Sequence, residues 1–168
     1  MGTYIWIHGE FTIRKSQIND AMQAIKDLNN HDELKRGGSS NGGRWFAWVD
    51  QDYDKTIETL EDVFSRVLGF EMRVLEETEE KISYSFNYND KWGQHEIFFV
   101  SMAPYCDELV INHLCDELDY EQQQWKIELN PVTKTVHSLE PVVMVMYPDM
   151  DESNEITVDS FRPVNYWG

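Results

Sequence analysis

Residues 50–61, DQDYDKTIETLE, place acidic side chains at the spacing of a calcium-binding loop. The acids that match its ligand positions are Asp50, Asp52, Asp54 and Glu61. Such a loop requires glycine between the third and fourth of its acidic positions, and here a lysine, Lys55, follows Asp54. Asp54 is also well placed to cap a helix over 55–68. The sequence therefore favours a capped helix, keeps a divalent metal site as the weaker alternative, and predicts no cofactor.

Another group of metal-ligand residue types lies in YCDELVINHLCDELDYE, where Cys106, His113 and Cys115 are close in sequence. The segment predicts a helix over about 105–119. At about 100° per residue the two cysteines would point in opposite directions on that helix. Two ligands on one helix do not close a zinc site, so Cys115 is predicted to be a core residue.

The polar face of this predicted helix carries a run of carboxylates that suits binding better than catalysis. The residues are Asp107, Glu108, Asp116, Glu117, Asp119 and Glu121, with a second patch at Asp149, Asp151 and Glu152. Acids at a helix C-terminus oppose the helix dipole and cost about 0.3–1 kcal/mol each. A chain that keeps them there gives up stability for negative surface, and we predict that these residues contact a partner.

Two further places suggest a small-ligand site. The residues are Tyr4, Trp6 and His8 on one face of a strand, and Arg36 and Arg44 around the glycine-rich stretch KRGGSSNGGR. Backbone amides in such a loop can cradle a phosphate, but the loop lacks the Gly-Lys-Ser/Thr ending of a P-loop. A polar strand face and a flexible connector are the plainer interpretations, and nucleotide or small-molecule binding is the alternative.

The net charge limits the classes of partner. The chain has 14 basic and 31 acidic residues, a net charge of −17, and residues 101–168 alone carry −10. Direct binding to nucleic acid needs a basic face, and an anionic membrane would repel this surface. Two cysteines, with no apolar leader at the N-terminus, predict a cytoplasmic protein.

The elements that must position these residues alternate between strands and helices. Strands are predicted over about 4–13, 44–49, 70–77, 81–88, 95–101, 123–129 and up to about 147, with helices over 16–28, 55–68 and 105–119. This order predicts an α+β fold with a mainly antiparallel sheet, about three helices packed on it, and a ferredoxin-like core in one or both halves. We expect a single domain over 1–147, with possible halves 1–77 and 78–147, and an acidic, aromatic tail over 148–168.

The function favoured by these features is binding without catalysis. We expect an acidic inhibitor that engages a basic, nucleic-acid-handling protein, its carboxylates imitating the phosphates of DNA. In size, charge and lack of catalytic motifs the chain is similar to the small phage proteins that inhibit restriction and CRISPR enzymes, a likeness of type that involves no sequence motif. The alternatives are a sequestering small-molecule or nucleotide-binding protein, and a metal-dependent hydrolase built on the acids of 50–61.

Overall fold

The computed structural model describes residues 4–37, 43–115, 123–138 and 155–161. These residues form one antiparallel sheet of seven strands in the order β2-β3-β1-β4-β5-β6-β7. The strands are β1 (Tyr4–Arg14), β2 (Glu71–Glu77), β3 (Lys81–Lys91), β4 (Cys106–Cys115), β5 (Gln123–Asn130), β6 (Thr135–Ser138) and β7 (Glu155–Ile156). The α+β class with a mainly antiparallel sheet is therefore confirmed.

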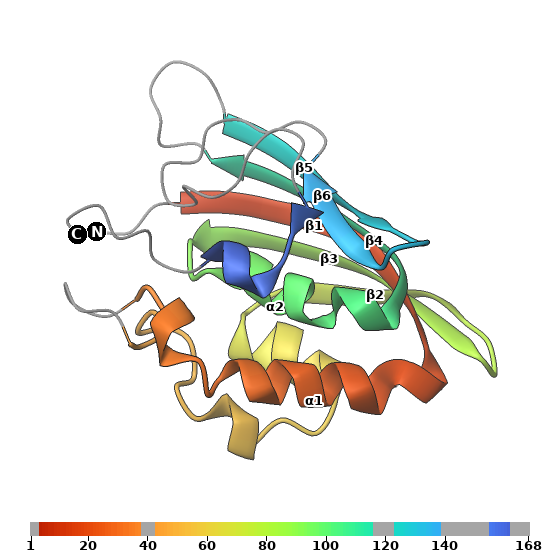
Figure 1. The fold of residues 1–168 in the computed structure, drawn as a ribbon, viewed down its shortest axis with the longest axis horizontal. Coiled ribbons are helices and arrows are strands. Elements are labelled where there is room, and N and C mark those ends of the chain that lie inside the picture. Colours follow the sequence, from red (N-terminus) through yellow and green to blue (C-terminus); the bar gives the residue numbers. More distant parts are fainter. Residues whose placement is uncertain (1–3, 38–42, 116–122, 139–154, 162–168) are drawn as a thin grey trace.

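Helices α1 (Ile18–Leu28) and α2 (His95–Met102) lie on the same face of the sheet (Figure 1). Within the first four strands, β3 lies between β1 and β2, and the chain order is β1-α1-β2-β3-α2-β4. This is the connectivity of a split β-α-β unit, extended at the β4 edge by three more strands. The ferredoxin-like assignment itself stays a prediction.

The alternation of β1 is the main determinant of the core. Ile5, Ile7, Phe11 and Ile13 are buried beneath the helices, as their spacing predicts. The buried face of α1 is formed by Ala21, Met22, Ile25 and Leu28, which recur at helical spacing. A layer of phenylalanines from α2, the strands and the helical segment 62–67 fills the space between helices and sheet. The rings of Phe64 and Phe99 are stacked with their centroids 4.6 Å apart.

Two segments have the opposite secondary structure from the one predicted. The predicted helix over 105–119 is strand β4, whose buried Leu109, Ile111 and His113 alternate and which pairs with β1. The predicted strand over 95–101 is α2, in which nearly every side chain is buried. A short apolar run fits a buried helix and a buried strand equally well, and packing against β1 decides between them.

The helix predicted over 55–68 is shorter and has a different cap. Residues 53–55 form a separate 3-10 turn, and the second helical segment, η4 (Asp62–Val67), follows a loop. The Asp62 carboxylate accepts hydrogen bonds from the Thr59 and Glu58 amides, at 3.1 and 2.8 Å, while the Thr59 hydroxyl accepts one from the Asp62 amide. This reciprocal arrangement is a capping box, so Thr59 and not Asp54 begins the helix.

The predicted strand over 44–49 is a loop held by one side chain. The Gln51 amide accepts a hydrogen bond from the Trp45 amide and donates to the carbonyls of Trp45, Phe46 and Val49. A side chain that satisfies four backbone groups takes the place of a neighbouring strand. The loop is fixed in the core by Trp45, which is buried and donates its indole N–H to Asn29 at 2.7 Å.

The predicted tail over 148–168 includes residues that belong to the sheet layer. Strand β7 pairs with β6, and Phe161, in the 3-10 turn that follows it, is buried. In the described part of the chain, no helix has the length and apolar character needed to span a bilayer.

The close approach of β1 and β4 at Gly9 gives a test of the sheet. A methyl group at Gly9 would lie 1.9 Å from the carbonyl oxygen of Val110 and 2.9 Å from the Phe86 ring. We expect Gly9→Ala to lower the free energy of unfolding by at least about 2 kcal/mol, measured by urea denaturation, because the strands must separate. The exposed neighbour is the control: Glu10→Ala should change it by less than about 0.5 kcal/mol. Equal effects of the two substitutions would contradict this strand pairing.

Candidate functional site

Asp107, at the start of β4, lies close to three basic side chains. It accepts from the Arg14 guanidinium at 3.2 Å and the Lys81 ammonium at 3.1 Å, and lies 3.7 Å from the Lys134 ammonium. These cations come from the end of β1, the start of β3 and the turn between β5 and β6. Asp107 therefore ties several strand ends together, and its charge is compensated within the chain.

The pKa of Asp107 reflects this network. Its partial burial works to raise the pKa of the carboxyl, but the hydrogen bonds and charges of Lys81 and Arg14 outweigh that effect and lower the pKa below its ordinary value. The stabilisation is thus complete above the ordinary aspartate pKa and is lost as the pH falls through the lowered one.

The other predicted partner-binding acids divide into two groups. Glu108 is exposed on β4, with its side chain on the opposite side of the strand from Leu109. Asp116, Glu117, Asp119, Glu121, Asp149, Asp151 and Glu152 lie outside the described residues. Since 106–115 is a strand, the predicted polar face of a helix does not unite Asp107 with these acids.

A different acidic surface, which none of the predicted sites includes, is present on the hairpin of β2 and β3. Its tip projects at the right-hand edge of Figure 1. Glu76, Glu77, Glu79 and Glu80 are all exposed, as are the aliphatic side chains of Val74 and Leu75 on the outermost strand. Within the described chain, the only ion pair of these four glutamates joins Glu77 to Lys15 at 3.7 Å.

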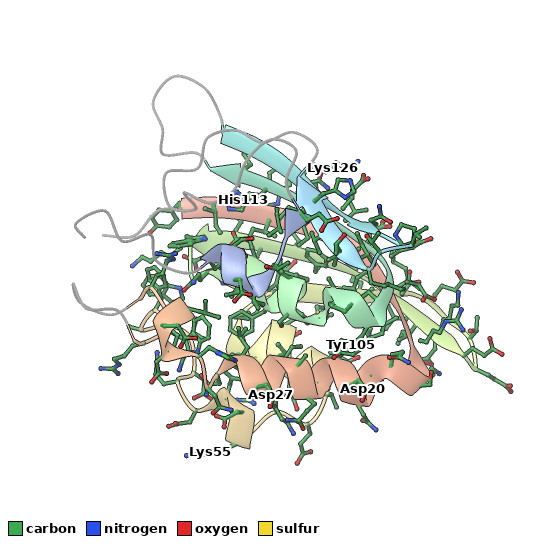
Figure 2. The ribbon with its side chains drawn as sticks, in the orientation of Figure 1. Asp20, Asp27, Lys55, Tyr105, His113 and Lys126 are labelled. Carbon is green, nitrogen blue, oxygen red and sulfur yellow. The ribbon has the colours of Figure 1, made fainter. Side chains whose placement is uncertain are left out.

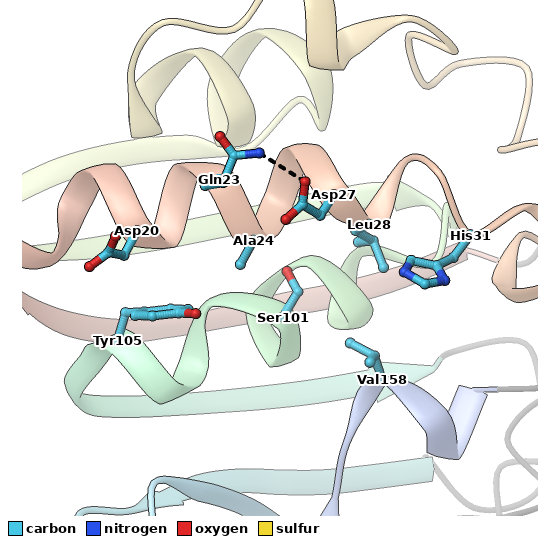
Figure 3. Close-up of a pocket in the computed structure, with 9 residues that line it drawn as sticks. All are labelled: Asp20, Gln23, Ala24, Asp27, Leu28, His31, Ser101, Tyr105 and Val158. Atoms are coloured by element: carbon cyan, nitrogen blue, oxygen red, sulfur yellow. Dashed lines mark hydrogen bonds between the residues drawn. The ribbon is translucent and has the colours of Figure 1, made fainter.

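A groove between α1 and the end of α2 is the second acidic feature, with a cavity of about 330 Å³ (Figure 3). One wall is α1, and the other is Ser101 of α2 together with Tyr105 of the 3-10 turn η5 (Ala103–Tyr105). Asp20 and Asp27 stand on the α1 wall, and Figure 2 shows them along the same side of that helix. This volume is within the range of small-ligand pockets.

The charge of the groove is negative and uncompensated. Asp27 accepts a hydrogen bond from the Gln23 amide at 2.8 Å, and no lysine or arginine of the described residues forms an ion pair with Asp20 or Asp27. His31, at the far end, is 3.1 Å from Glu33. The groove therefore suits a cation with an apolar or planar body.

No protein-family model, curated protein or solved structure matches this chain.

The aromatic residues predicted as a weak ligand site lie on the open face of the sheet. Tyr4 and Trp6 are exposed, and the Trp6 ring lies 4.5 Å from that of His8. The Trp6 indole N–H donates to Asn87 on β3 at 2.5 Å. The three residues share a face as predicted, and none of them lines the groove beside α1.

The two arginines predicted with them do not share a site. Arg36 donates to the carbonyl of Phe161, and its backbone amide donates to the Gln94 side chain at 3.0 Å, so it holds the chain in place. Arg44 is exposed. The loop centre, 38–42, lies outside the described residues.

Another cavity, of about 370 Å³, has basic side chains in its wall. Both have partners within the chain, because Arg66 contacts Asp50 and Lys91 lies over the Trp48 ring.

The acids of 50–61 have separate partners. Asp50 pairs with Arg66 at 3.6 Å, Asp52 lies 4.0 Å from Lys55, Asp54 accepts from Asn29 at 2.7 Å, and Glu61 accepts from the Tyr84 hydroxyl. No three of the described histidine, cysteine, aspartate and glutamate side chains converge as a metal site would require. A hydrolase built on these acids has no support from this arrangement.

A buried polar cluster, which the sequence did not predict, lies between α2 and β4. Glu96 is fully buried, accepts from the Trp92 indole N–H at 3.1 and 3.2 Å, and lies 3.1 Å from the His113 ring nitrogen. The pairing of Glu96 and His113 requires the helix and strand that the sequence assigned the other way round. The only feature of the sequence that could have indicated this cluster is the pair of adjacent polar residues at 95–96, directly before an apolar run. A buried carboxylate with these partners fixes the start of α2 against β4.

Removing the charge of Asp107 tests its structural role. We expect Asp107→Asn to lower the free energy of unfolding by about 1–2 kcal/mol at low salt, since three partly exposed cations lose their common counter-ion. Glu108→Gln, which neutralises the exposed neighbour, should change it by less than about 0.5 kcal/mol. Urea denaturation measures both, and a larger loss for Glu108→Gln would contradict the assignment.

The buried imidazole of His95 predicts a specific pH dependence. Burial lowers its pKa from 6.5 to about 4, although the nearby Glu96 charge acts in the opposite direction. Between pH 6.5 and 4 the unfolded chain binds a proton that the folded chain does not, so the free energy of unfolding decreases as the pH is lowered through this window. The whole decrease due to His95 is about 3 kcal/mol. His95→Gln should lose this component in urea denaturation at pH 7 and pH 4, whereas equal pH dependence in both proteins would contradict it.

Proposed function

We propose that this chain binds a basic protein through its exposed carboxylates, without catalysis, and that it competes with nucleic acid for that protein. The observation that carries the proposal is the β2–β3 hairpin. Its four tip glutamates are exposed, and all but Glu77 lack an ion pair within the described chain. A partner with a basic surface would supply the missing cations.

The composition of the hairpin supports protein binding rather than solubility alone. Val74 and Leu75 are 55% and 52% exposed beside the glutamates, on the edge strand of the sheet. Interfaces combine apolar anchors, which contribute affinity, with charged groups, which direct the encounter. Edge strands are also protected by charge and by bulges, and β2 has a register shift between Val74 and Glu76. The same glutamates would therefore repel an acidic segment of another protein from the edge strand β2 and attract a basic one.

The class of partner follows from charge. Proteins that handle nucleic acid present basic surfaces to phosphates, and a net charge of −17 makes this chain a competitor for such surfaces. The small phage inhibitors of restriction and CRISPR enzymes act on partners of this class. An inhibitor that imitates DNA is the specific form of the proposal.

The test uses a hairpin variant and defined elution conditions. The immobilised chain is incubated with lysate of its native host, and bound protein is eluted either with duplex DNA or with about 0.5 M salt, at which exposed charges are largely screened. We expect the wild-type chain to retain a basic protein that both treatments release. The variant Glu76→Gln, Glu79→Gln, Glu80→Gln should retain less than about a tenth as much, because attraction between the surfaces is lost.

A control variant removes the same charge elsewhere. Asp52→Asn, Glu58→Gln and Glu155→Gln neutralise three exposed acids away from the hairpin and should leave retention within about twofold of wild type. Equal loss in both variants would show that net charge alone matters. Retention that resists DNA and salt, or no loss in the hairpin variant, would contradict the proposal.

A further inference from the structure

We infer that the groove between α1 and α2 receives an arginine side chain of the basic partner. This inference rests on the proposed function and adds a concave anchor point to the exposed hairpin. The groove offers what a guanidinium on an alkyl stem requires: carboxylates for the charge, an aromatic ring for the planar group, and apolar side chains for the stem.

The geometry of α1 sets the spacing of the carboxylates. Asp20 and Asp27 are two helical turns apart, about 10 Å along the axis at 1.5 Å per residue. Ala24 lies between them on the same side and leaves room in the groove (Figure 3). The Tyr105 ring lies opposite Asp20, and Leu28 and Val158 form the apolar end. A side chain that enters over Ala24 can place its guanidinium between Asp20 and the Tyr105 ring.

The exposure of the two aspartates indicates what kind of occupant fits. Asp20 and Asp27 are both exposed, and single exposed ion pairs contribute little on their own. A free cation of small size would therefore bind weakly. A side chain delivered by a larger interface is already oriented by the other contacts, so the groove adds affinity at little further entropic cost. Arginine also dominates the energetics of such interfaces more often than lysine does.

The Asp20 end of the groove lies on the side of the molecule that carries the hairpin. The amide of Lys15, in the turn that leads into α1, donates to the carbonyl of Glu80 at the hairpin tip, at 2.8 Å. Asp20 follows on the first turn of α1. Tyr105 is two residues from Asp107, whose cations come from Arg14 and Lys81, beside the same tip. A partner that covers the hairpin can thus reach the Asp20 end of the groove.

The test requires no partner. Nα-acetyl-arginine methylamide is titrated into the isotopically labelled full chain, and backbone amide shifts are followed by NMR at low salt. We expect the largest shifts at Asp20, Ala24, Asp27 and Tyr105, with a dissociation constant on the order of millimolar. The citrulline analogue has the same shape without the charge, and should bind at least tenfold more weakly. The lysine analogue should bind at least threefold more weakly, since it cannot stack on the ring.

Variants decide between this groove and general attraction to an acidic surface. Asp20→Asn with Asp27→Asn should weaken binding of the arginine probe at least tenfold, whereas Asp52→Asn with Glu58→Gln should leave it within twofold. Absence of shifts in the groove, equal binding of the citrulline or lysine analogue, or equal effects of the two variants would overturn the inference. If the probe binds here but no hairpin-dependent capture occurs, the proposed function fails while the groove remains a guanidinium site. If capture depends on the hairpin and is unchanged in the Asp20→Asn, Asp27→Asn variant, only the role of the groove in the partner complex fails.

Discussion

The convergence of Arg14, Lys81 and Lys134 on Asp107 is the interaction on which the charge distribution of this molecule depends. The chain has 14 basic residues for 31 acidic ones, and it uses three of them on one carboxylate at the junction of several strand ends. Lys81 begins strand β3 directly after the glutamates of the hairpin tip, yet its ammonium group is directed to Asp107. Because these basic side chains are paired with Asp107, they do not neutralise the glutamates of the β2–β3 hairpin, and the hairpin tip stays negative.

The acidic hairpin and the acidic groove are two consequences of the same imbalance. At the hairpin, exposed glutamates follow two exposed aliphatic side chains on a projecting edge, and in the groove Asp20 faces the Tyr105 ring across a cavity that Asp27 also lines. A convex charged element next to a concave one is a geometry that a basic protein can match at two points. The buried group of Glu96, Trp92 and His113 serves a different purpose, because it is sealed from solvent and fixes α2 against β4.

Secondary structure could be predicted from the sequence where the spacing of apolar residues fits only one element. The prediction was wrong where the spacing fits both a helix and a strand. Alternation over about 4–13 and the two successive strands predicted over 70–77 and 81–88 are strong signals, and the structure has strands there, β1, β2 and β3. In 106–115 the apolar residues fit a helix as well as a strand, and only pairing with β1 makes it a strand. The candidate site shows the same limit: Asp20 and Tyr105 are far apart in the sequence, and their approach follows from the packing of α1 against α2, which no local pattern encodes.

We propose that a basic partner contacts the hairpin tip and the adjoining end of α1. Hydrogen–deuterium exchange of the full chain, with and without any basic protein recovered in the capture experiment, tests this most directly. We expect slower exchange at 76–80 and at the start of α1 in the complex, reversed by about 0.5 M salt. Protection confined to the open face of the sheet, or protection at the tip that persists at this salt concentration, would contradict it.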